Sequence, residues 1–283
     1  MIYIACALYC EAKPFIEYYH LQKALTFHHF QVFKNEKFIV IITKQGKIHA
    51  AIAVTELFHR YPPKKTDFFI NIGIAASAHT NGVIGKGYLC NKLIDGDSER
   101  TYYPDFIYQN PFDECSLISV SKEFTGTSLP CNKDSSETLI DMEATGIYSA
   151  ALYFLEQQQL LFFKVISDHG NTKELTPTII TNYIQAYLSA LDDFFLHLIE
   201  NVPKKNTLDF ENNELELIQL LSEKLFCSVT MTRQLKQYLI YAKLNHIQID
   251  ELLTKALREL EIEPLHSKRE GKLYFENFKQ KLI

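Results

Sequence analysis

Apolar residues in the first two hundred positions of the chain form short continuous runs that alternate with stretches of helical spacing. The runs are rich in Ile, Val, Phe and Tyr and lie near turn residues, which is typical of buried strands. The predicted strands are residues 2–8, 38–43, 67–72, 87–94 and 161–167. The predicted helices between them are residues 13–24, 49–59, 143–156 and 177–200. This alternation predicts a three-layer α/β/α fold around a mixed, largely parallel, twisted sheet.

The pattern changes after residue 201. Residues 202–213 are polar, with a proline and two lysines, and are predicted to be a linker. No strand pattern follows, and four further helices are predicted, with Thr232 and Asp250 as N-caps. Their ranges are residues 215–226, 232–244, 250–260 and 268–282. We therefore predict two domains, an α/β domain over residues 1–201 and a small all-helical C-terminal domain over residues 208–283.

Composition narrows the class of protein. With 47% hydrophobic and 22% charged residues among 283, a packed core is expected rather than disorder. A net charge of -5 argues against a protein that coats nucleic acid, and no apolar run is long enough to predict a membrane span. Six scattered cysteines without a CxxC spacing, in a chain without an export signal, predict reduced thiols and a cytoplasmic location. No metal site or cofactor is predicted.

Two segments place a carboxylate where a predicted strand ends, the edge of the sheet at which ligands bind. Glu11 lies at the first strand–helix junction, where it is either functional or a charge that favours the positive end of the next helix. Asp168 ends the buried run 161–167, where it is either a turn residue or a partly buried acid.

Three further segments carry small residues or paired carboxylates. Residues 45–51 and 71–76 contain a glycine and small side chains, which leave space for a flat ring or allow a tight turn. In residues 141–146, alternation along an extended chain sends Asp141 and Glu143 to one side and Met142 to the other. The same two acids are also ordinary in the first turn of a helix.

Together and in this order, these segments resemble the nucleoside phosphorylase/nucleosidase superfamily, and within it the methylthioadenosine/S-adenosylhomocysteine nucleosidases. The matching stretches are ALYCEA at residues 7–12, KQGKIHAA at 44–51, NIGIAA at 71–76, DMEA at 141–144 and KVISD at 164–168. DMEA followed by ISD is the most specific part. The resemblance covers about residues 1–195, so the helical tail lies outside it.

The resemblance implies an enzyme that hydrolyses the N-glycosidic bond of an adenosine-type purine nucleoside, such as methylthioadenosine, S-adenosylhomocysteine or a 5′-deoxyadenosine-like compound. It implies that Asp168 protonates N7 of the purine and that Glu11 activates water. Glu143 is expected to hold the ribose hydroxyls. The other implied substrate-binding residues are Met142 against the ribose, Ser167 beside Asp168, Ala75 and Ala76 along the purine, and Ile74 and Lys164 near the water.

Two of these positions depart from the family's pattern. Ile74 stands where the family has a serine, and Lys164 where it has an arginine, so a hydroxyl and a planar fork of donors are lost. The family's Ser-Gly-Asp loop before MEA is also missing, and residues 122–127 stand in its place. These departures leave the three carboxylates intact but put the purine selection, the 5′ group and the water network in question.

Two alternatives to a hydrolase stay open. Phosphorylases of the superfamily bind phosphate with glycine and arginine after the first strand, where this chain carries Glu11 and no arginine. A carboxylate repels phosphate, so the hydrolase is favoured over a phosphorylase or a non-catalytic nucleoside-binding relative. A homodimer is expected, and residues 91–95 with 100–105 form either a tyrosine-rich hairpin over the core or a cover for the 5′ end of the substrate. Nucleic acid is not an expected partner.

Overall fold

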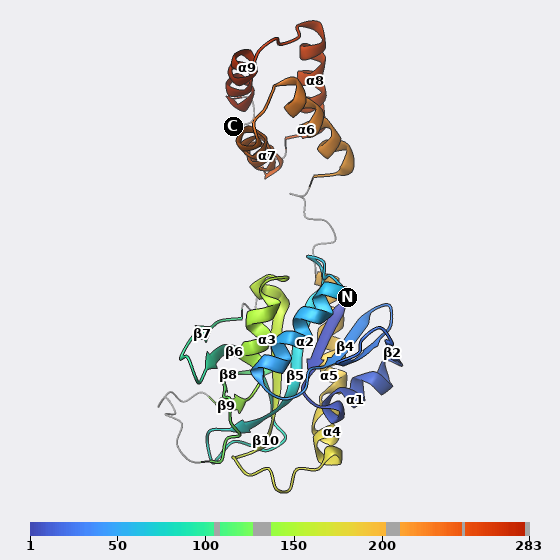
Figure 1. Cartoon of the computed structure of the whole chain (residues 1–283), viewed down its shortest axis with the longest axis vertical. Helices are drawn as coiled ribbons and strands as arrows, with labels where there is room; N and C mark the ends of the chain where they lie inside the picture. The colour runs from blue at the N-terminus through green and yellow to red at the C-terminus, as the bar shows by residue number, and fades with distance from the viewer. Residues whose placement is uncertain (105–107, 127–136, 202–209, 245–246, 281–283) are drawn as a thin grey trace. The chain divides into compact units, whose positions relative to one another are not determined.

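The protein divides into two compact units, Met1–Val202 and Pro203–Ile283, which we call the α/β unit and the helical unit (Figure 1). The computed structural model describes residues 1–104, 108–126, 137–201, 210–244 and 247–280. The predicted linker lies mostly outside these residues, and its last two positions, Asn212 and Asn213, already belong to a helix. That each unit folds by itself stays a prediction.

A mixed sheet forms the centre of the α/β unit (Figure 1). Its strands are β1 (Ile2–Cys6), β2 (Gln22–Lys23), β3 (Gln31–Lys34), β4 (Phe38–Ile42), β5 (Phe68–Ser77), β6 (Gly87–Asp95), β7 (Thr101–Tyr102), β8 (Asp113–Ser119), β9 (Thr138–Asp141) and β10 (Leu160–Asp168). The predicted mixed α/β fold is confirmed.

The largely parallel character of the sheet is not confirmed. Parallel pairings join β1 to β4 and β5, β5 to β10, and β8 to β6 and β9. Antiparallel pairings join β3 to β2 and β4, β6 to β7 and β10, and β5 to β9. Within the described part of the chain the two kinds are therefore balanced. The antiparallel pairings come mainly from short strands, which the apolar pattern did not predict.

Five strands close into a ring. β10, β6, β8, β9 and β5 pair in this order, and β5 pairs again with β10. The strand β5 can serve both the open part of the sheet and the ring because of its length. Its first residues pair with β1, from Ile2↔Phe68 to Ala5↔Asn71, whereas its last residues pair with β9. A closed ring leaves no unpaired edge, so the strand ends around it are held from both sides.

Helices cover both faces of the sheet (Figure 1). The helices α2 (Lys47–Arg60) and α3 (Ala144–Ala151) share one core with residues such as Tyr3 and Ala5 of β1. The helices α1 (Tyr9–Tyr18), α4 (Pro177–Gln185) and α5 (Leu188–Asn201) share the other core with Ile2 and Ile4. Successive residues of β1 enter opposite cores, which explains why the whole strand is buried. A short 3₁₀ helix, η1 (Gln157–Gln159), precedes β10.

The predicted helix over residues 177–200 is two helices, α4 and α5. Tyr187 lies at the break between them, and its hydroxyl accepts a hydrogen bond from the amide of Gly87 (2.6 Å) and donates one to the carbonyl of Gly85 (3.1 Å). Contacts to a distant segment therefore hold this bend, so the local pattern gave no sign of it.

The helical unit consists of α6 (Asn212–Lys224), α7 (Val229–Leu244), α8 (Ile249–Ile262) and α9 (Lys268–Gln280). They enclose a core of their own that includes Leu221, Leu235 and Phe275. The predicted N-caps are wrong. Thr232 lies inside α7, and the hydroxyl that accepts from a backbone amide at the start of this helix, that of Met231, belongs to Ser228. Asp250 lies inside α8, which begins at Ile249. Within the described residues, no helix has the length and apolar content needed to cross a membrane.

Candidate active site

A pocket of about 360 Å³ opens where β1, β5, β9 and β10 end. We call it the carboxylate pocket, because the carboxylate-bearing residues Glu11, Glu123, Asp141, Glu143 and Asp168 line it. All but one of the predicted site residues line it too, namely Glu11, Ile74, Ala75, Ala76, Met142, Glu143, Ser167 and Asp168. The exception is Lys164. The fold therefore brings together segments that are up to 157 positions apart, from Glu11 to Asp168.

Glu11 is buried in the first turn of α1, and backbone amides hold both of its oxygens. The Leu8 amide donates to Oε2 (2.8 Å) and the Ile74 amide donates to Oε1 (2.9 Å). Burial raises the pKa of the Glu11 carboxyl, and Lys164 and these amides partly oppose the shift. Gly73 leaves room for this carboxyl, because a Cβ there would lie 2.7 Å from Oε1 of Glu11. The site thus contains a carboxyl group that is fixed in position and whose pKa lies above its ordinary value.

Glu143 lies at the N-cap of α3, where the Gly46 amide donates to its Oε1 (2.8 Å). Gly46 has a φ of 95°, a left-handed conformation that favours glycine, and nothing would obstruct a Cβ there. The backbone conformation, rather than space, therefore requires this glycine. Burial, together with the neighbouring Asp141, raises the pKa of Glu143 to about 7, against the opposing effect of Lys164.

Asp168 ends β10 next to an irregularity of the strand. Ile166 pairs with Ala75 and Asp168 with Ala76, so Ser167 is left over between them, as in a β-bulge. The Ser167 hydroxyl donates to Oδ2 of Asp168 (2.7 Å), and the Gly170 amide donates to Oδ1 (2.7 Å). The contact between Ser167 and Asp168 is the one that the sequence predicted, and it fixes the carboxyl at the pocket wall.

Lys164 lies behind the pocket rather than on its surface. Its ammonium pairs with Oδ2 of Asp141 at 2.9 Å. Burial alone would lower the pKa of this ammonium, but the carboxylates of Asp141, Glu143 and Glu11 raise it well above its ordinary value. Lys164 therefore stays charged and offsets part of the negative charge of the site.

Several residues of the pocket were not assigned a role from the sequence. Asp141 accepts hydrogen bonds from the Ser119 hydroxyl (2.6 Å) and the Ala144 amide (3.0 Å), which place it beside Lys164. Glu123 and Phe124 come from the segment 122–127 that stands in place of the family's loop. Thr172 donates to Glu123 (2.6 Å) and so links this segment to the turn after β10. Thr127 lies outside the described residues.

The tyrosine-rich segment does not line the carboxylate pocket. Tyr102 pairs with Leu93 in the β6–β7 hairpin, and its ring lies 5.0 Å from that of Tyr148 in α3. This arrangement matches a hairpin that covers the core. Asp105, the end of the segment, lies outside the described residues. In the described part of the chain, the carboxylate pocket included, no three His, Cys, Asp or Glu side chains are grouped to hold a metal ion.

The chain has the fold of solved nucleosidases and of a futalosine hydrolase. It is similar to the 5′-methylthioadenosine/S-adenosylhomocysteine nucleosidase of Helicobacter pylori, solved with butyl-thio-DADMe-Immucillin-A, at 14% identity and a TM-score of 0.56 over 71% of this chain and 98% of that one. The futalosine hydrolase of Helicobacter pylori aligns at 14% identity and a TM-score of 0.55, over 71% and 97% of the two chains. The corresponding nucleosidase of Neisseria meningitidis, in complex with methylthio-immucillin-A, aligns at 11% and 0.54, over 71% and 99%.

These similarities concern the fold. The predicted resemblance is confirmed at that level. The α/β unit has 202 of the 283 residues, a share of the chain equal to the 71% that aligns. No protein-family model matches the chain, and no curated protein sequence matches it.

Proposed function

We propose that the α/β unit hydrolyses the N-glycosidic bond of an adenosine-type purine nucleoside. One observation carries this proposal. The acid, the base and the sugar-binding carboxylate implied by the sequence, Asp168, Glu11 and Glu143, line a single pocket, although they come from three separate segments. The three-dimensional similarity to nucleosidases supports the same reaction class.

In the proposed reaction, Asp168 acts at the purine end of the N-glycosidic bond and Glu11 acts at the ribose end. Asp168 gives its proton to N7 of the purine, so that the bond between the base and C1′ of the ribose breaks and the base leaves neutral. Water adds its oxygen to C1′, and Glu11 takes the proton that the water releases. The hydrogen bonds from Ser167 and Gly170 fix the Asp168 carboxyl at the pocket wall, where the purine is proposed to bind. The amides on Glu11 fix its position for the water.

Glu143 is assigned to the ribose. When ionised, its carboxylate accepts hydrogen bonds from sugar hydroxyls at both oxygens, and its charge also stabilises a ribosyl cation. Because the pKa of Glu143 is about 7, we expect substrate binding to become stronger as the pH rises through 7. Met142 is adjacent on the pocket wall and is assigned to packing against the sugar, with Ala75 and Ala76 along the purine. Lys164 receives a positioning role through Asp141.

The charge of the pocket favours water over phosphate as the nucleophile. Glu11, Glu123, Asp141, Glu143 and Asp168 line it, whereas no lysine or arginine does among the described residues. A phosphate ion would meet these carboxylates without a cation to neutralise it. The same argument favours a nucleoside with a neutral 5′ substituent, such as methylthioadenosine or 5′-deoxyadenosine, over a nucleotide.

The test is to incubate the pure protein with adenosine, inosine, methylthioadenosine and 5′-deoxyadenosine, with and without phosphate, and to measure free base and free sugar. We expect phosphate-independent release of adenine with a free ribose product. Release that requires phosphate and yields a sugar 1-phosphate would assign a phosphorylase instead. Saturable binding of methylthioadenosine without any base release would assign a non-catalytic binding protein.

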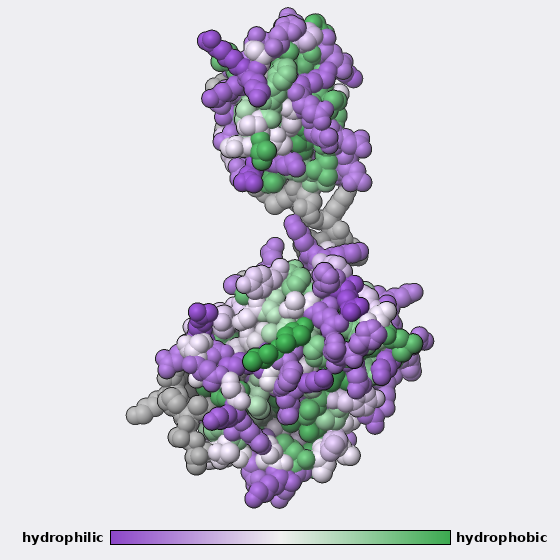
Figure 2. Space-filling model, in the orientation of Figure 1, coloured by the Kyte–Doolittle hydropathy of each residue, from purple (hydrophilic) through white to green (hydrophobic). Residues whose placement is uncertain are grey.

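A homodimer and a cytoplasmic location also stay proposals. The helix α2 exposes Ile48 (77%) and Ile52 (54%), and Figure 2 shows apolar surface over α2 on the face in view. Such a patch is suited to a second copy of the chain. Sedimentation of the protein and of an Ile48→Glu/Ile52→Glu variant tests this, with a dimer expected for the first and a monomer for the second.

A further inference from the structure

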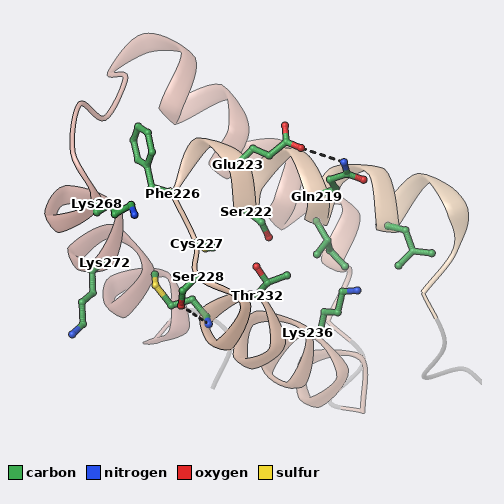
Figure 3. Close-up of a pocket in the computed structure, with 13 residues that line it drawn as sticks. Gln219, Ser222, Glu223, Phe226, Cys227, Ser228, Thr232, Lys236, Lys268 and Lys272 are labelled. Carbon is green, nitrogen blue, oxygen red and sulfur yellow. Dashed lines mark hydrogen bonds between the residues drawn. The ribbon is translucent and has the colours of Figure 1, made fainter.

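We propose that the helical unit binds a small amphiphile, a molecule that joins an anionic head group to an apolar body. The site is a pocket of about 830 Å³ between the end of α6 and the first turns of α7 and α9 (Figure 3). We call it the helical-unit pocket. Its volume falls within the range of about 300–1,000 Å³ that is usual for small-molecule sites. This inference does not depend on the proposed nucleosidase activity.

Part of the wall of the helical-unit pocket is apolar, and the rest is polar or charged. Leu215, Ile218, Phe226 and Met231 line it. Phe226 is 42% exposed and has a φ of 52°, a conformation that is uncommon for a bulky residue. The aromatic ring is thus partly exposed at the pocket and is not among the core residues of the unit. An apolar ligand would remove this ring from water.

A buried hydroxyl without a partner points into the same space. Ser222 is 9% exposed, and its Oγ has no hydrogen-bond partner in the described residues. Figure 3 shows its side chain directed from α6 toward Thr232 on α7. Buried hydroxyls are nearly always paired because an unpaired one destabilises the fold. A polar atom of a ligand in the pocket would supply the missing partner.

The charges around the helical-unit pocket favour an anion. Lys236, Lys268 and Lys272 line it, and none of them has an ion pair with another described residue. The N-terminus of α9 carries partial positive charge at the same place, since α9 begins at Lys268. Glu223 is the one lining carboxylate, and it accepts a hydrogen bond from Gln219 at 3.2 Å. The excess of lysines is local, because the whole chain has a net charge of -5.

These features together select the ligand class. A nucleic acid would need an extended basic surface, whereas here three lysines line one pocket that also has apolar wall residues. An anion alone would leave the apolar walls and Phe226 in water. A molecule with both parts places its body between α6 and α7 and its head group among the lysines, within reach of Ser222 and Thr232.

The three methionines of the chain allow a site-resolved test. Met231 lines the helical-unit pocket, Met142 lines the carboxylate pocket, and Met1 begins the chain. The full-length protein labelled with ¹³C at the methionine methyl groups is titrated with decanoate and followed by NMR. We expect a saturable shift of the Met231 signal and none of the Met142 signal. Acetate and inorganic phosphate, which carry only an anionic head, and decanol, which carries only the body, should bind at least about tenfold more weakly.

Variants separate binding from folding. Exchanging Lys236, Lys268 and Lys272 for Gln should weaken decanoate binding at least about tenfold, whereas Lys255→Gln, an exposed lysine of α8 outside the pocket, should leave it unchanged. Ser222→Ala should weaken binding about fivefold. It should also raise the melting temperature of the free protein, because it removes the unpartnered hydroxyl.

Three outcomes would overturn the inference. The first is a Met231 signal that decanoate leaves unmoved. The second is binding that decanol matches or that survives loss of the three lysines, which would mean non-specific apolar contact. The third is a Met231 signal that responds to an acidic amphipathic peptide but not to decanoate, which would assign the pocket to a protein partner.

Discussion

The ammonium of Lys164 lies 2.9 Å from Oδ2 of Asp141, and at most 2% of either side chain is exposed. The same cation lowers the pKa of Glu11 and of Glu143, against the burial that raises both. Asp141 accepts two further hydrogen bonds, from Ser119 and Ala144, so its charge is well satisfied. One buried lysine therefore keeps three carboxyl groups of the site compatible with the folded state.

Lys164→Met should lower the free energy of unfolding by about 3–5 kcal/mol, because it leaves the buried Asp141 charge without a partner. It should also raise the pKa of Glu11 and Glu143 further, so the rise of activity with pH should move to higher pH. Lys164→Arg keeps the charge and should change both properties less. Chemical denaturation and pH–rate profiles measure the two effects.

The matched control is the exposed pair of Lys86 and Asp113, whose charged atoms lie 2.7 Å apart. Lys86→Met should change the unfolding free energy by less than about 1 kcal/mol, since exposed ion pairs contribute little. Equal losses in the two variants would mean that burial of the Lys164 pair has no special effect.

Asp168→Asn should reduce the rate of base release at least about a hundredfold, because an amide cannot protonate N7. The fold should be retained, since an amide oxygen can still accept a hydrogen bond from Gly170. Single-turnover assays of nucleoside cleavage, with circular dichroism as the check on folding, measure this. A variant that keeps more than about a tenth of the rate would refute the role of Asp168 as the acid.

Gly73→Ala should impair hydrolysis without altering any carboxylate. The new Cβ would lie 2.7 Å from Oε1 and 3.2 Å from Cδ of Glu11, so the Glu11 carboxyl must move away from the Ile74 amide. We expect kcat to fall at least about tenfold, because the base is displaced from the water. Binding of a non-hydrolysable nucleoside analogue should change much less. Unchanged kcat would show that water is activated elsewhere and that Glu11 is only a charge at the start of α1.

Glu143→Gln should stabilise the protein at alkaline pH while it weakens substrate binding. The pKa of Glu143 rises from its ordinary 4.5 in the unfolded chain to about 7 in the folded protein. The contribution of Glu143 to the free energy of unfolding is therefore greatest below pH 4.5. It falls by on the order of 3 kcal/mol as the pH rises through 7. The Gln variant should remove that loss, so its unfolding free energy should exceed the wild-type value at pH 8 but not at pH 4. Glu36→Gln, at an exposed position, should show no such pH dependence.

Removing residues 208–283 should leave a chain that unfolds cooperatively. The helical unit has its own core, and no residue of that core belongs to the two cores of the α/β unit. Thermal unfolding of the truncated chain, compared with the full chain, measures this. An insoluble product, or one without a cooperative transition, would mean that the two units form one folding domain.

The sequence predicted those elements whose own residues determine them. Every residue of β10 is buried, so its apolar run stood out, and α2 was found from the spacing of its apolar side chains. The strand β8, with the sequence DECSLIS, mixes exposed and buried positions, and β9 has four residues. These two strands are held in the ring by pairing with strands that are distant in sequence, and a local sequence pattern cannot predict such pairing.

The same distinction applies to the site. Glu11, Glu143 and Asp168 lie in segments whose resemblance to a family was visible, and the structure brings them to one pocket. The alternation of Asp141 and Glu143 gave no sign that their carboxyls engage different partners, Lys164 for Asp141 and the Gly46 amide for Glu143. Those partners are set by the packing of β10 and of the turn before α2 against the start of α3.

From the ring of strands we expect the site to be completed late in folding. Glu11 follows β1, and its amide partner Ile74 is in β5, but Asp168 reaches the pocket only when β10 has paired with β5, and Asp141 only when β9 has done so. These pairings join parts of the chain that are distant in sequence, and such contacts form slowly. A nascent chain that ends before β10 contains the proposed base Glu11 but lacks the proposed acid Asp168. Enzymatic activity would then appear only when these strands have paired. In a refolding experiment it should return after the circular dichroism signal of the helices has recovered.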